Sequence, residues 1–369
     1  KSQEIIQKQQ ESLATNIGRA TTEIIANASL LGYSPYIMDG IYLSAYQILN
    51  MLALQDYQGL RIEVNRAYQK QQMAAELLEK QIQKQQQENQ ENQQAMAQTE
   101  KILGEYADLA KWKGYEDFLN PYATYLSGLT FLARATSSSD YETAATYLKR
   151  VLGMVPENTV VKEDVEVAEA AANGLQAPPN ATWIIFENGL VANLEEFRVD
   201  LPIFLVSNEV QTASLAIPRP KERASAYGFI TISTGEEQSH TQLLADVDSM
   251  FISEFNKRFP GILTKAIIKL TAQTVAQAAA KKNLGTWGSI GAAIYSVATA
   301  GADLRSWYSL PKNVQLSKIN KTGTSQTISL KTETGLELGS VEVPAEGNHI
   351  IYIRVPSAGS APSISLFQL

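Results

Sequence analysis

The chain of 369 residues contains no cysteine and only two histidines, His240 and His349. Without cysteine there is no disulfide, no thiolate metal ligand and no cysteine nucleophile. So little histidine argues against a histidine-rich metal site, and neither histidine stands near a serine in a nucleophile motif. A phosphate-binding loop is also missing, because Gly285, Gly288 and Gly291 are followed by no Lys-Ser or Lys-Thr pair. We therefore predict no enzyme activity, no cofactor and no metal.

Positive charge is not in excess anywhere in the chain. The net charge is −7, and all of the acidic excess falls in the first 175 residues, since residues 176–369 are balanced. Proteins that bind nucleic acid usually present a basic face. We therefore expect no nucleic-acid partner.

The composition changes near residue 175. Before it, Gln, Glu, Ala and Leu are frequent and proline is rare, as in helices. After Pro178-Pro179, short runs of alternating or β-branched residues are broken by Gly, Pro, Asn and Ser. We predict an α+β fold, with a helical domain over residues 1–175 and a β-rich domain over residues 176–369.

The helical half begins with an apolar stripe that predicts a helix over residues 3–29, followed by helices over residues 36–53 and from Tyr57 onward. Residues 69–100 are rich in Gln and contain no Gly or Pro. The row of apolar residues at helical spacing is interrupted within this stretch and then resumes. We therefore predict a long coiled helical hairpin over about residues 60–111, with its tip near residues 88–92. The alternative is a single Gln-rich surface helix.

Two helix pairs resemble each other, one over residues 42–67 and one over residues 122–151. In each pair an Asp-Tyr dipeptide, Asp56-Tyr57 or Asp140-Tyr141, opens the second helix. Paired antiparallel helices of this kind are typical of tetratricopeptide-like repeats, although an unrelated helical bundle remains an alternative.

The first helix of each pair carries one apolar face, and tyrosine is a common interface anchor. We predict that these two faces form a protein-binding groove. The alternative is that the coiled hairpin covers them and that the tyrosines are core residues. The candidate binding residues are Tyr42, Ala45, Leu49 and Leu52 in the first pair and Tyr122, Tyr125, Leu129 and Leu132 in the second.

We predict that the second half consists of short strands with a helical insert over about residues 243–303. The spacing of the strands favours a β-sandwich over an open sheet. Nine strands are expected: residues 183–187, 196–204, 213–217, 227–233, 313–319, 325–331, 337–343, 349–355 and 363–367.

Within the insert, residues 283–302 carry no charge. We interpret them as a small-residue helix packed against its neighbour, with membrane insertion as the alternative. Asp303 and Arg305 follow, and we predict that they form a structural ion pair. A divalent-metal site on Asp246, Asp248 and Asp303 is the less favoured alternative, since hard cations need more oxygen ligands than this spacing provides.

Several motifs follow one another in a specific order along the chain: residues 42–67, Asn120 to Gly128, Phe186 to Leu190, Arg198 to Pro202, Ile217 to Pro220, Ala245 to Asp248, Ala302 to Trp307 and Leu310-Pro311. Their order resembles a family of uncharacterised bacterial envelope proteins, mostly predicted lipoproteins with a tetratricopeptide-like first half. The resemblance implies export to the periplasm and an outer-membrane lipid anchor on an upstream cysteine.

From these features we expect a non-catalytic scaffold of the bacterial envelope that binds other envelope proteins. By association, the resemblance implies a role in an outer-membrane, peptidoglycan-synthesis or flagellar and surface assembly. Two alternatives stay open: a cell-wall-acting enzyme or ligand-binding protein, and a membrane-inserting oligomer that uses residues 283–302.

Overall fold

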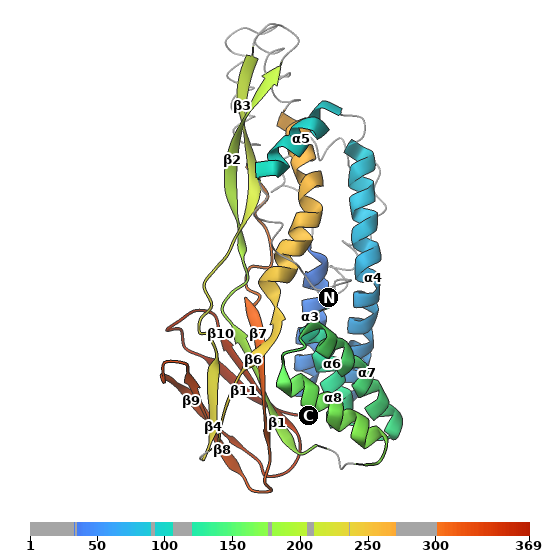
Figure 1. Cartoon of the computed structure of the whole chain (residues 1–369), viewed down its shortest axis with the longest axis vertical. Coiled ribbons are helices and arrows are strands. Elements are labelled where there is room, and N and C mark those ends of the chain that lie inside the picture. Colours follow the sequence, from blue (N-terminus) through green and yellow to red (C-terminus); the bar gives the residue numbers. More distant parts are fainter. Residues whose placement is uncertain are drawn as a thin grey trace.

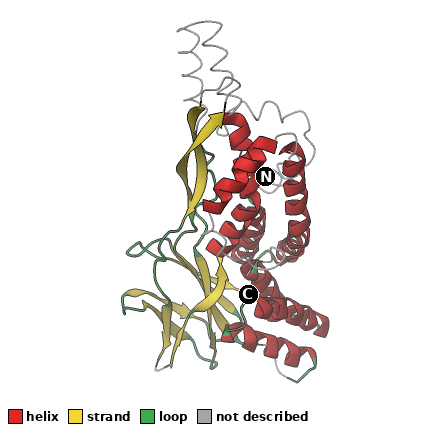
Figure 2. Ribbon diagram, turned by 45° about the horizontal axis from the view of Figure 1, so that its top comes forward, coloured by secondary structure: helices red, strands yellow, loops and turns green. Residues whose placement is uncertain are grey.

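The computed structural model describes residue 33 and residues 35–89, 93–105, 120–175, 179–204, 210–235, 237–270 and 301–369. The helix predicted over residues 3–29 lies outside the described residues, as do all but the last two residues of the uncharged segment 283–302. The fold is α+β, with the helices gathered on one side of an elongated molecule and most strands on the other (Figures 1 and 2).

In the helical half, α3 packs on α4, α6 on α7 and α7 on α8. Asn120 and Asn158 start α6 and α8 by accepting hydrogen bonds from the backbone amides of Ala123 and Val161, both at 3.1 Å. The helices are α3 (Ile37–Ala53), α4 (Tyr57–Asn89), α5 (Gln93–Glu105), α6 (Pro121–Ala133), α7 (Ser138–Met154) and α8 (Thr159–Ala172).

The first of the two Asp-Tyr pairs works as predicted. Asp56 accepts a hydrogen bond from the amide of Gly59 at 2.9 Å, so it caps α4. Asp140 instead lies in the first turn of α7, where its Oδ2 accepts hydrogen bonds from the amide (2.9 Å) and hydroxyl (3.0 Å) of Thr136. Its carboxylate therefore fixes the loop between α6 and α7 rather than capping a helix.

α4 and α5 end and begin on either side of residues 90–92, where the tip of the hairpin was predicted, but they do not pack along each other, so the predicted coiled pairing of the two arms is wrong for the described residues. The buried face of α5 contacts a helix at residues 247–270, where Thr99 Oγ1 and Thr264 Oγ1 lie 2.9 Å apart. The distal part of α4 contacts the same helix, because Arg258 donates a hydrogen bond to Gln81 at 2.8 Å. Both helices thus pack on the insert helix, residues 247–270: α4 runs beside it and α5 lies across its upper part (Figure 1).

The β half contains two sheets and a separate two-stranded ribbon. One sheet has the order β11-β10-β1-β7-β6, the other β5-β4-β8-β9, and β2 pairs only with β3. The strands are β1 (Ala181–Asn188), β2 (Asn193–Phe204), β3 (Val210–Lys221), β4 (Ile230–Thr234), β5 (Glu237–His240), β6 (Gln242–Asp246), β7 (Asn313–Asn320), β8 (Gln326–Thr332), β9 (Glu337–Val343), β10 (His349–Val355) and β11 (Ser363–Gln368).

The central strand β1 is buried along its whole length. Its side chains alternate between the faces of the sheet. Trp183 and Ile185 pack into the core that includes the helices, whereas Ile184 and Phe186 pack into a second core against the four-stranded sheet. The molecule therefore has three layers: helices, five-stranded sheet and four-stranded sheet. The last two form the predicted sandwich.

The β2–β3 ribbon extends away from the sandwich alongside the 247–270 helix (Figure 1). Leu215 and Ile217, 5% and 0% exposed, belong to the main core, and Val199, paired with Leu215, packs against it. The neighbouring positions Glu196 and Arg198 are exposed. The ribbon is thus amphipathic over its proximal part, with its apolar face on the core.

The start of the helical insert was predicted wrongly. Residues 242–246 form β6, which pairs with β7, and the helix begins only at residue 247. Residues 237–240, which are not among the nine predicted strands, form β5 at the edge of the four-stranded sheet. Both strands are short and lie at sheet edges, where polar side chains are tolerated and alternation is weak.

The change from helix to strand falls between Ala172, the end of α8, and Ala181, the start of β1, which agrees with the composition change near residue 175. One hydrophobic cluster nevertheless includes side chains from both halves, among them Tyr42, Tyr122 and Trp183. The helical layer therefore packs directly on the five-stranded sheet.

Candidate functional site

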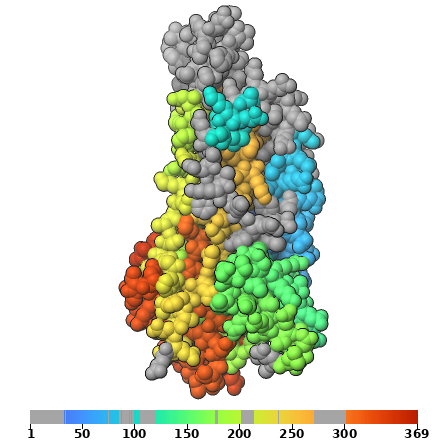
Figure 3. All heavy atoms as spheres, viewed as in Figure 1, coloured from blue at the N-terminus to red at the C-terminus, as the bar shows by residue number. Residues whose placement is uncertain are grey.

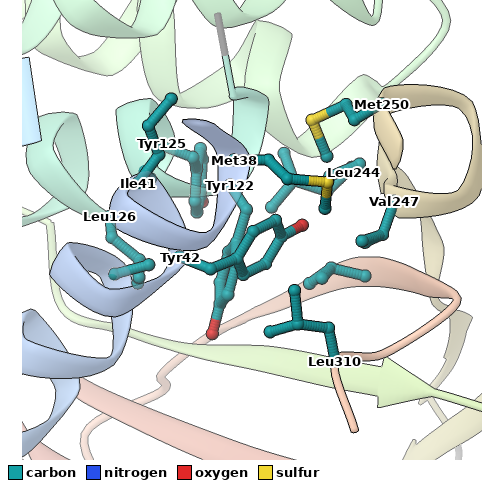
Figure 4. Close-up of a cluster of buried hydrophobic side chains, with 14 of the residues drawn as sticks. Met38, Ile41, Tyr42, Tyr122, Tyr125, Leu126, Leu244, Val247, Met250 and Leu310 are labelled. Atoms are coloured by element: carbon teal, nitrogen blue, oxygen red, sulfur yellow. The ribbon is translucent and has the colours of Figure 1, made fainter. Parts of the chain in front are cut away.

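The eight residues predicted to form a binding face are core residues. Tyr42 and Tyr122 are both 0% exposed, and their ring centroids lie 6.2 Å apart. Figure 4 shows them among side chains of the β half and the insert helix, including Leu244 and Leu310. The other six residues, Ala45, Leu49, Leu52, Tyr125, Leu129 and Leu132, are at most 5% exposed.

The prediction of a groove on this face is therefore wrong, and the reason is physical. An apolar helix face packs on another element of the chain or on a partner protein, and the spacing of its residues does not show which of the two it is. Here the five-stranded sheet and the 247–270 helix fill the space that an open repeat array would leave free. The covering element is thus the β half and the insert helix.

The predicted ion pair of Asp303 and Arg305 is present, with 2.8 Å between Oδ2 and Nη2. Both side chains are about one third exposed, at 37% and 34%, so the pair contributes little to stability. Asp248 pairs with Lys312, and Asp246 accepts hydrogen bonds from Ser249. Within the described residues, no group of three acidic or histidine side chains is arranged to hold a metal ion.

A buried charged network joins the helices to the sheet around Asp164 of α8. Its carboxylate, 0% exposed, accepts hydrogen bonds from Tyr125 Oη at 2.5 Å, Trp183 Nε1 at 2.9 Å and Lys318 Nζ at 2.9 Å. The same ammonium group bonds to Glu163 at 2.9 Å. All partners come from different elements, so the network fixes α6, α8, β1 and β7 relative to one another.

The protonation of this network follows from its surroundings. Burial raises the pKa of Asp164 above its usual value, although the charge of Lys318 opposes the shift. Burial also acts to lower the pKa of Lys318, but the charges and hydrogen bonds of Asp164 and Glu163 outweigh it, so the pKa of Lys318 is raised. Asp164 accepts three hydrogen bonds and Lys318 donates two, all to or from side chains of packed elements, and we interpret the pair as structural.

A second buried carboxylate, Glu187 of β1, lies beneath α3. It is paired with Arg354 and accepts a hydrogen bond from Tyr46 Oη at 3.1 Å. Burial raises its pKa, and Arg354 opposes the shift. Nearby, the hydroxyl of Tyr122 is buried without a hydrogen-bond partner among the described residues.

The amino terminus of α3 is held by a carboxylate of the insert helix. Glu254 accepts hydrogen bonds from the amides of Ile37 at 2.7 Å and Met38 at 3.1 Å, where negative charge complements the helix dipole. Asp39 lies next to it and accepts a hydrogen bond from Tyr33 Oη at 2.6 Å. Burial raises the pKa of Asp39 to about 7, and the charge of Glu254 adds to the shift.

The best candidate binding site is a surface pocket of about 270 Å³ between α4 and α6, which we call the arginine groove. Its floor is apolar, since Leu60 and Val64 are 1% and 0% exposed. Figure 3 shows the green block of residues 120–175 at the surface, directly below the blue surface of α4. The lining residues are Tyr57, Gln58, Leu60, Arg61, Val64, Thr130, Phe131, Arg134 and Thr136.

The two arginines of the groove differ in their partners. Arg61, whose side chain is 58% exposed, pairs with Asp140 at 3.0 Å. Burial acts to raise the pKa of Asp140, but hydrogen bonds from Thr136 and the charge of Arg61 together outweigh it, so the pKa of Asp140 lies below its usual value and its carboxylate is ionised. Arg134 lies over the ring of Tyr57, with its Cζ 3.3 Å from the ring centroid. Among the described residues, no carboxylate pairs with Arg134.

Aromatic rings extend the groove along α4 and α7. Phe131 stacks on Tyr147, with centroids 6.0 Å apart and planes 12° apart. Tyr147 meets Tyr68 edge to face at 5.8 Å, and Arg150 lies 5.3 Å from the Tyr68 centroid. Rings and guanidinium groups that are half exposed are the side chains most common at interface hot spots.

Sequence analysis did not identify the groove. One indication was present: Tyr57 and Arg61 are four residues apart, and Phe131 and Arg134 are three apart, so each pair shares a helix face. That α4 and α6 would bring these faces together followed only from the packing of the helices. The groove nevertheless lies in the two helix pairs that the tetratricopeptide-like pattern identified.

Comparison with protein-family models, with curated proteins and with solved structures finds no match for this chain. Among the described residues, no helix combines the length and the apolar character that crossing a bilayer requires.

Proposed function

We propose that this protein is a non-catalytic scaffold that binds other proteins of the bacterial envelope through the arginine groove. The groove carries this proposal because it combines half-exposed aromatic rings with guanidinium groups over an apolar floor, which is the composition of interface hot spots. Its position is also fixed, since the helices that form it are packed on the sheet. A preorganised site loses less conformational entropy when a partner binds.

The cellular setting rests on the resemblance of the motif order to bacterial envelope lipoproteins. It supports a location in the periplasm, with attachment to the outer membrane through a lipid on an upstream cysteine. Fractionation of the native bacterium with an antibody against this chain tests the setting. We expect the protein in the outer-membrane fraction and its release by detergent; recovery in the cytoplasmic fraction would contradict it.

The binding function is tested by recovering partners from native envelope extract on the full chain. We expect Phe131→Ala to reduce the recovery of specific partners, because truncating an interface aromatic costs about 2 kcal/mol or more, roughly thirtyfold in affinity. Phe197→Ala is the matched control, because Phe197 on the β2–β3 ribbon is also a partly exposed ring beside an arginine, Arg219, at 5.3 Å.

Both variants must keep the melting temperature of the unsubstituted protein for the comparison to count. If the same partners are recovered on Phe131→Ala and on Phe197→Ala, the arginine groove is not the binding surface. If Phe131→Ala leaves the recovery of partners intact while Phe197→Ala abolishes it, the binding surface is the β2–β3 ribbon.

A further inference from the structure

We infer that the arginine groove binds an extended acidic peptide, in which one carboxylate pairs with Arg134 and a neighbouring aliphatic side chain lies on Leu60 and Val64. This inference rests on the proposed scaffold function and names the chemistry of its ligand. It is carried by the charge of the groove, the free guanidinium and the apolar floor.

The charge of the groove is opposite to that of the chain as a whole. The protein has a net charge of −7, whereas the residues that line the groove include two arginines and no acidic side chain. One of the two positive charges is neutralised, because Arg61 pairs with Asp140. Among the described residues, no carboxylate pairs with Arg134. The groove therefore offers one positively charged group to one carboxylate of a ligand.

The geometry of Arg134 suits a carboxylate. Its guanidinium group is stacked on the Tyr57 ring at 3.3 Å, which holds the plane of the group and leaves its N–H donors at the edge. A planar fork of donors binds a carboxylate with two parallel hydrogen bonds. Because the stacking fixes the fork in advance, little side-chain entropy is lost on binding.

The floor of the groove supplies a contact for an apolar side chain next to that carboxylate. Leu60 and Val64 are buried beneath the groove, and Phe131 forms one wall, half-buried. The volume of about 270 Å³ is below the usual range for cofactor and drug-sized pockets. It suits one side chain and the adjoining backbone of a peptide.

A polyanion such as RNA is a poorer occupant. Neutralising a phosphate backbone takes several lysines or arginines along one surface, and here one unpaired arginine lies on an acidic protein. An acidic peptide with alternating apolar residues satisfies both parts of the groove, so we assign this class of ligand.

The test uses fluorescence anisotropy with the full chain and three labelled peptides that differ only in charge: Leu-Glu-Glu-Leu-Glu-Leu, its Gln analogue and its Lys analogue, all with amidated carboxyl ends. We expect only the Glu peptide to bind, with an affinity that falls as salt rises. Arg134→Gln should weaken this binding at least tenfold. Arg134→Lys, which keeps the charge but not the fork, should restore part of it.

Arg219→Gln is the matched control, since Arg219 also lies over an aromatic ring, Phe197, but outside the groove. It should leave binding unchanged. Equal binding of the Glu and Gln peptides, no binding of any peptide up to millimolar concentration, or equal affinity for Arg134→Gln and the unsubstituted protein would overturn the inference. So would Arg134-dependent binding of phosphatidylglycerol vesicles in place of the Glu peptide.

The outcome separates this inference from the proposed function. If envelope partners are lost on Phe131→Ala but the Glu peptide does not bind, the groove binds proteins by another chemistry and only the acidic ligand is refuted. If the Glu peptide binds through Arg134 but recovery of envelope partners does not depend on Phe131, the ligand class stands and the scaffold role fails.

Discussion

Removing the carboxylate of Asp164 is expected to cost a large part of the stability of this protein. The substitution Asp164→Ala leaves Lys318, whose side chain is 2% exposed, without its buried partner and leaves the donors of Tyr125 and Trp183 unpaired. Breaking one side of a buried ion pair costs about 3–5 kcal/mol. Each orphaned donor adds about 1–3 kcal/mol, and the remaining contact of Lys318 with Glu163 recovers part of the loss.

We therefore expect Asp164→Ala to lower the free energy of unfolding by about 5 kcal/mol, against a typical total of about 5–15 kcal/mol. Urea unfolding followed by circular dichroism measures the change. The shift of the midpoint reports stability if the slope of the unfolding free energy against urea concentration is the same for both proteins. Glu163→Ala is the matched control, since Glu163 contacts the same ammonium group from the adjacent position but is 44% exposed. It should cost about 1 kcal/mol or less.

A double variant tests whether burial or pairing is responsible. Replacing both charges, as in Asp164→Leu with Lys318→Met, removes the ion pair without leaving a buried charge. It should be clearly more stable than Asp164→Ala, because replacing a buried pair by apolar side chains is often close to neutral. Equal losses for Asp164→Ala and Glu163→Ala, or a double variant no more stable than the single one, would refute the reasoning.

Three further predictions follow from single contacts. The pKa of Asp39 is raised to about 7, so between pH 4 and 7 the native state keeps a proton that the unfolded chain releases. The free energy of unfolding should therefore fall by up to ~1.4 kcal/mol per pH unit as pH rises from about 4 to 7. Asp39→Asn should remove this pH dependence, measured by urea unfolding at each pH. A Cβ on Gly128 would lie 3.0 Å from a side-chain carbon of α7, so Gly128→Ala should destabilise the fold by about 1–3 kcal/mol through overpacking and lower the melting temperature. Gly153 has open space around it, so Gly153→Ala should raise the melting temperature. Tyr122→Phe removes a buried hydroxyl without a partner among the described residues and should not destabilise the fold, but Tyr125→Phe should cost about 1–2 kcal/mol in the same assay.

Local patterns in the sequence predicted most elements of the fold. The strands β9 and β10 have the predicted bounds, and the composition change marks where helix gives way to strand. The pattern underestimated β3, which runs to Lys221 through Pro218 and Pro220. In a two-stranded ribbon each strand has a free edge, where a residue without an amide donor is tolerated.

The site was harder to predict because it depends on which helix faces meet. Periodicity identified the apolar face of α3 and α6 that carries Tyr42 and Tyr122, but not the sheet that covers it. The groove residues Tyr57 and Arg134 are 77 positions apart in the sequence and lie together only because α4 packs beside α6. Local spacing carries no information on contacts at that sequence separation.

The central strand has a consequence for how the chain folds. β1 pairs in parallel with β10, so that Thr182 lies opposite His349, and its other neighbour is β7. β7 begins only at Asn313, so neither neighbour of β1 is synthesised until the helical insert has followed it, although β1 is buried along its whole length in the finished sheet. Pairing between strands so distant in sequence is slow, because a long loop must close first. Both edges of β1 therefore stay unpaired while the insert is synthesised, and the sheet beneath the helices is completed only after β7 and β10 have followed.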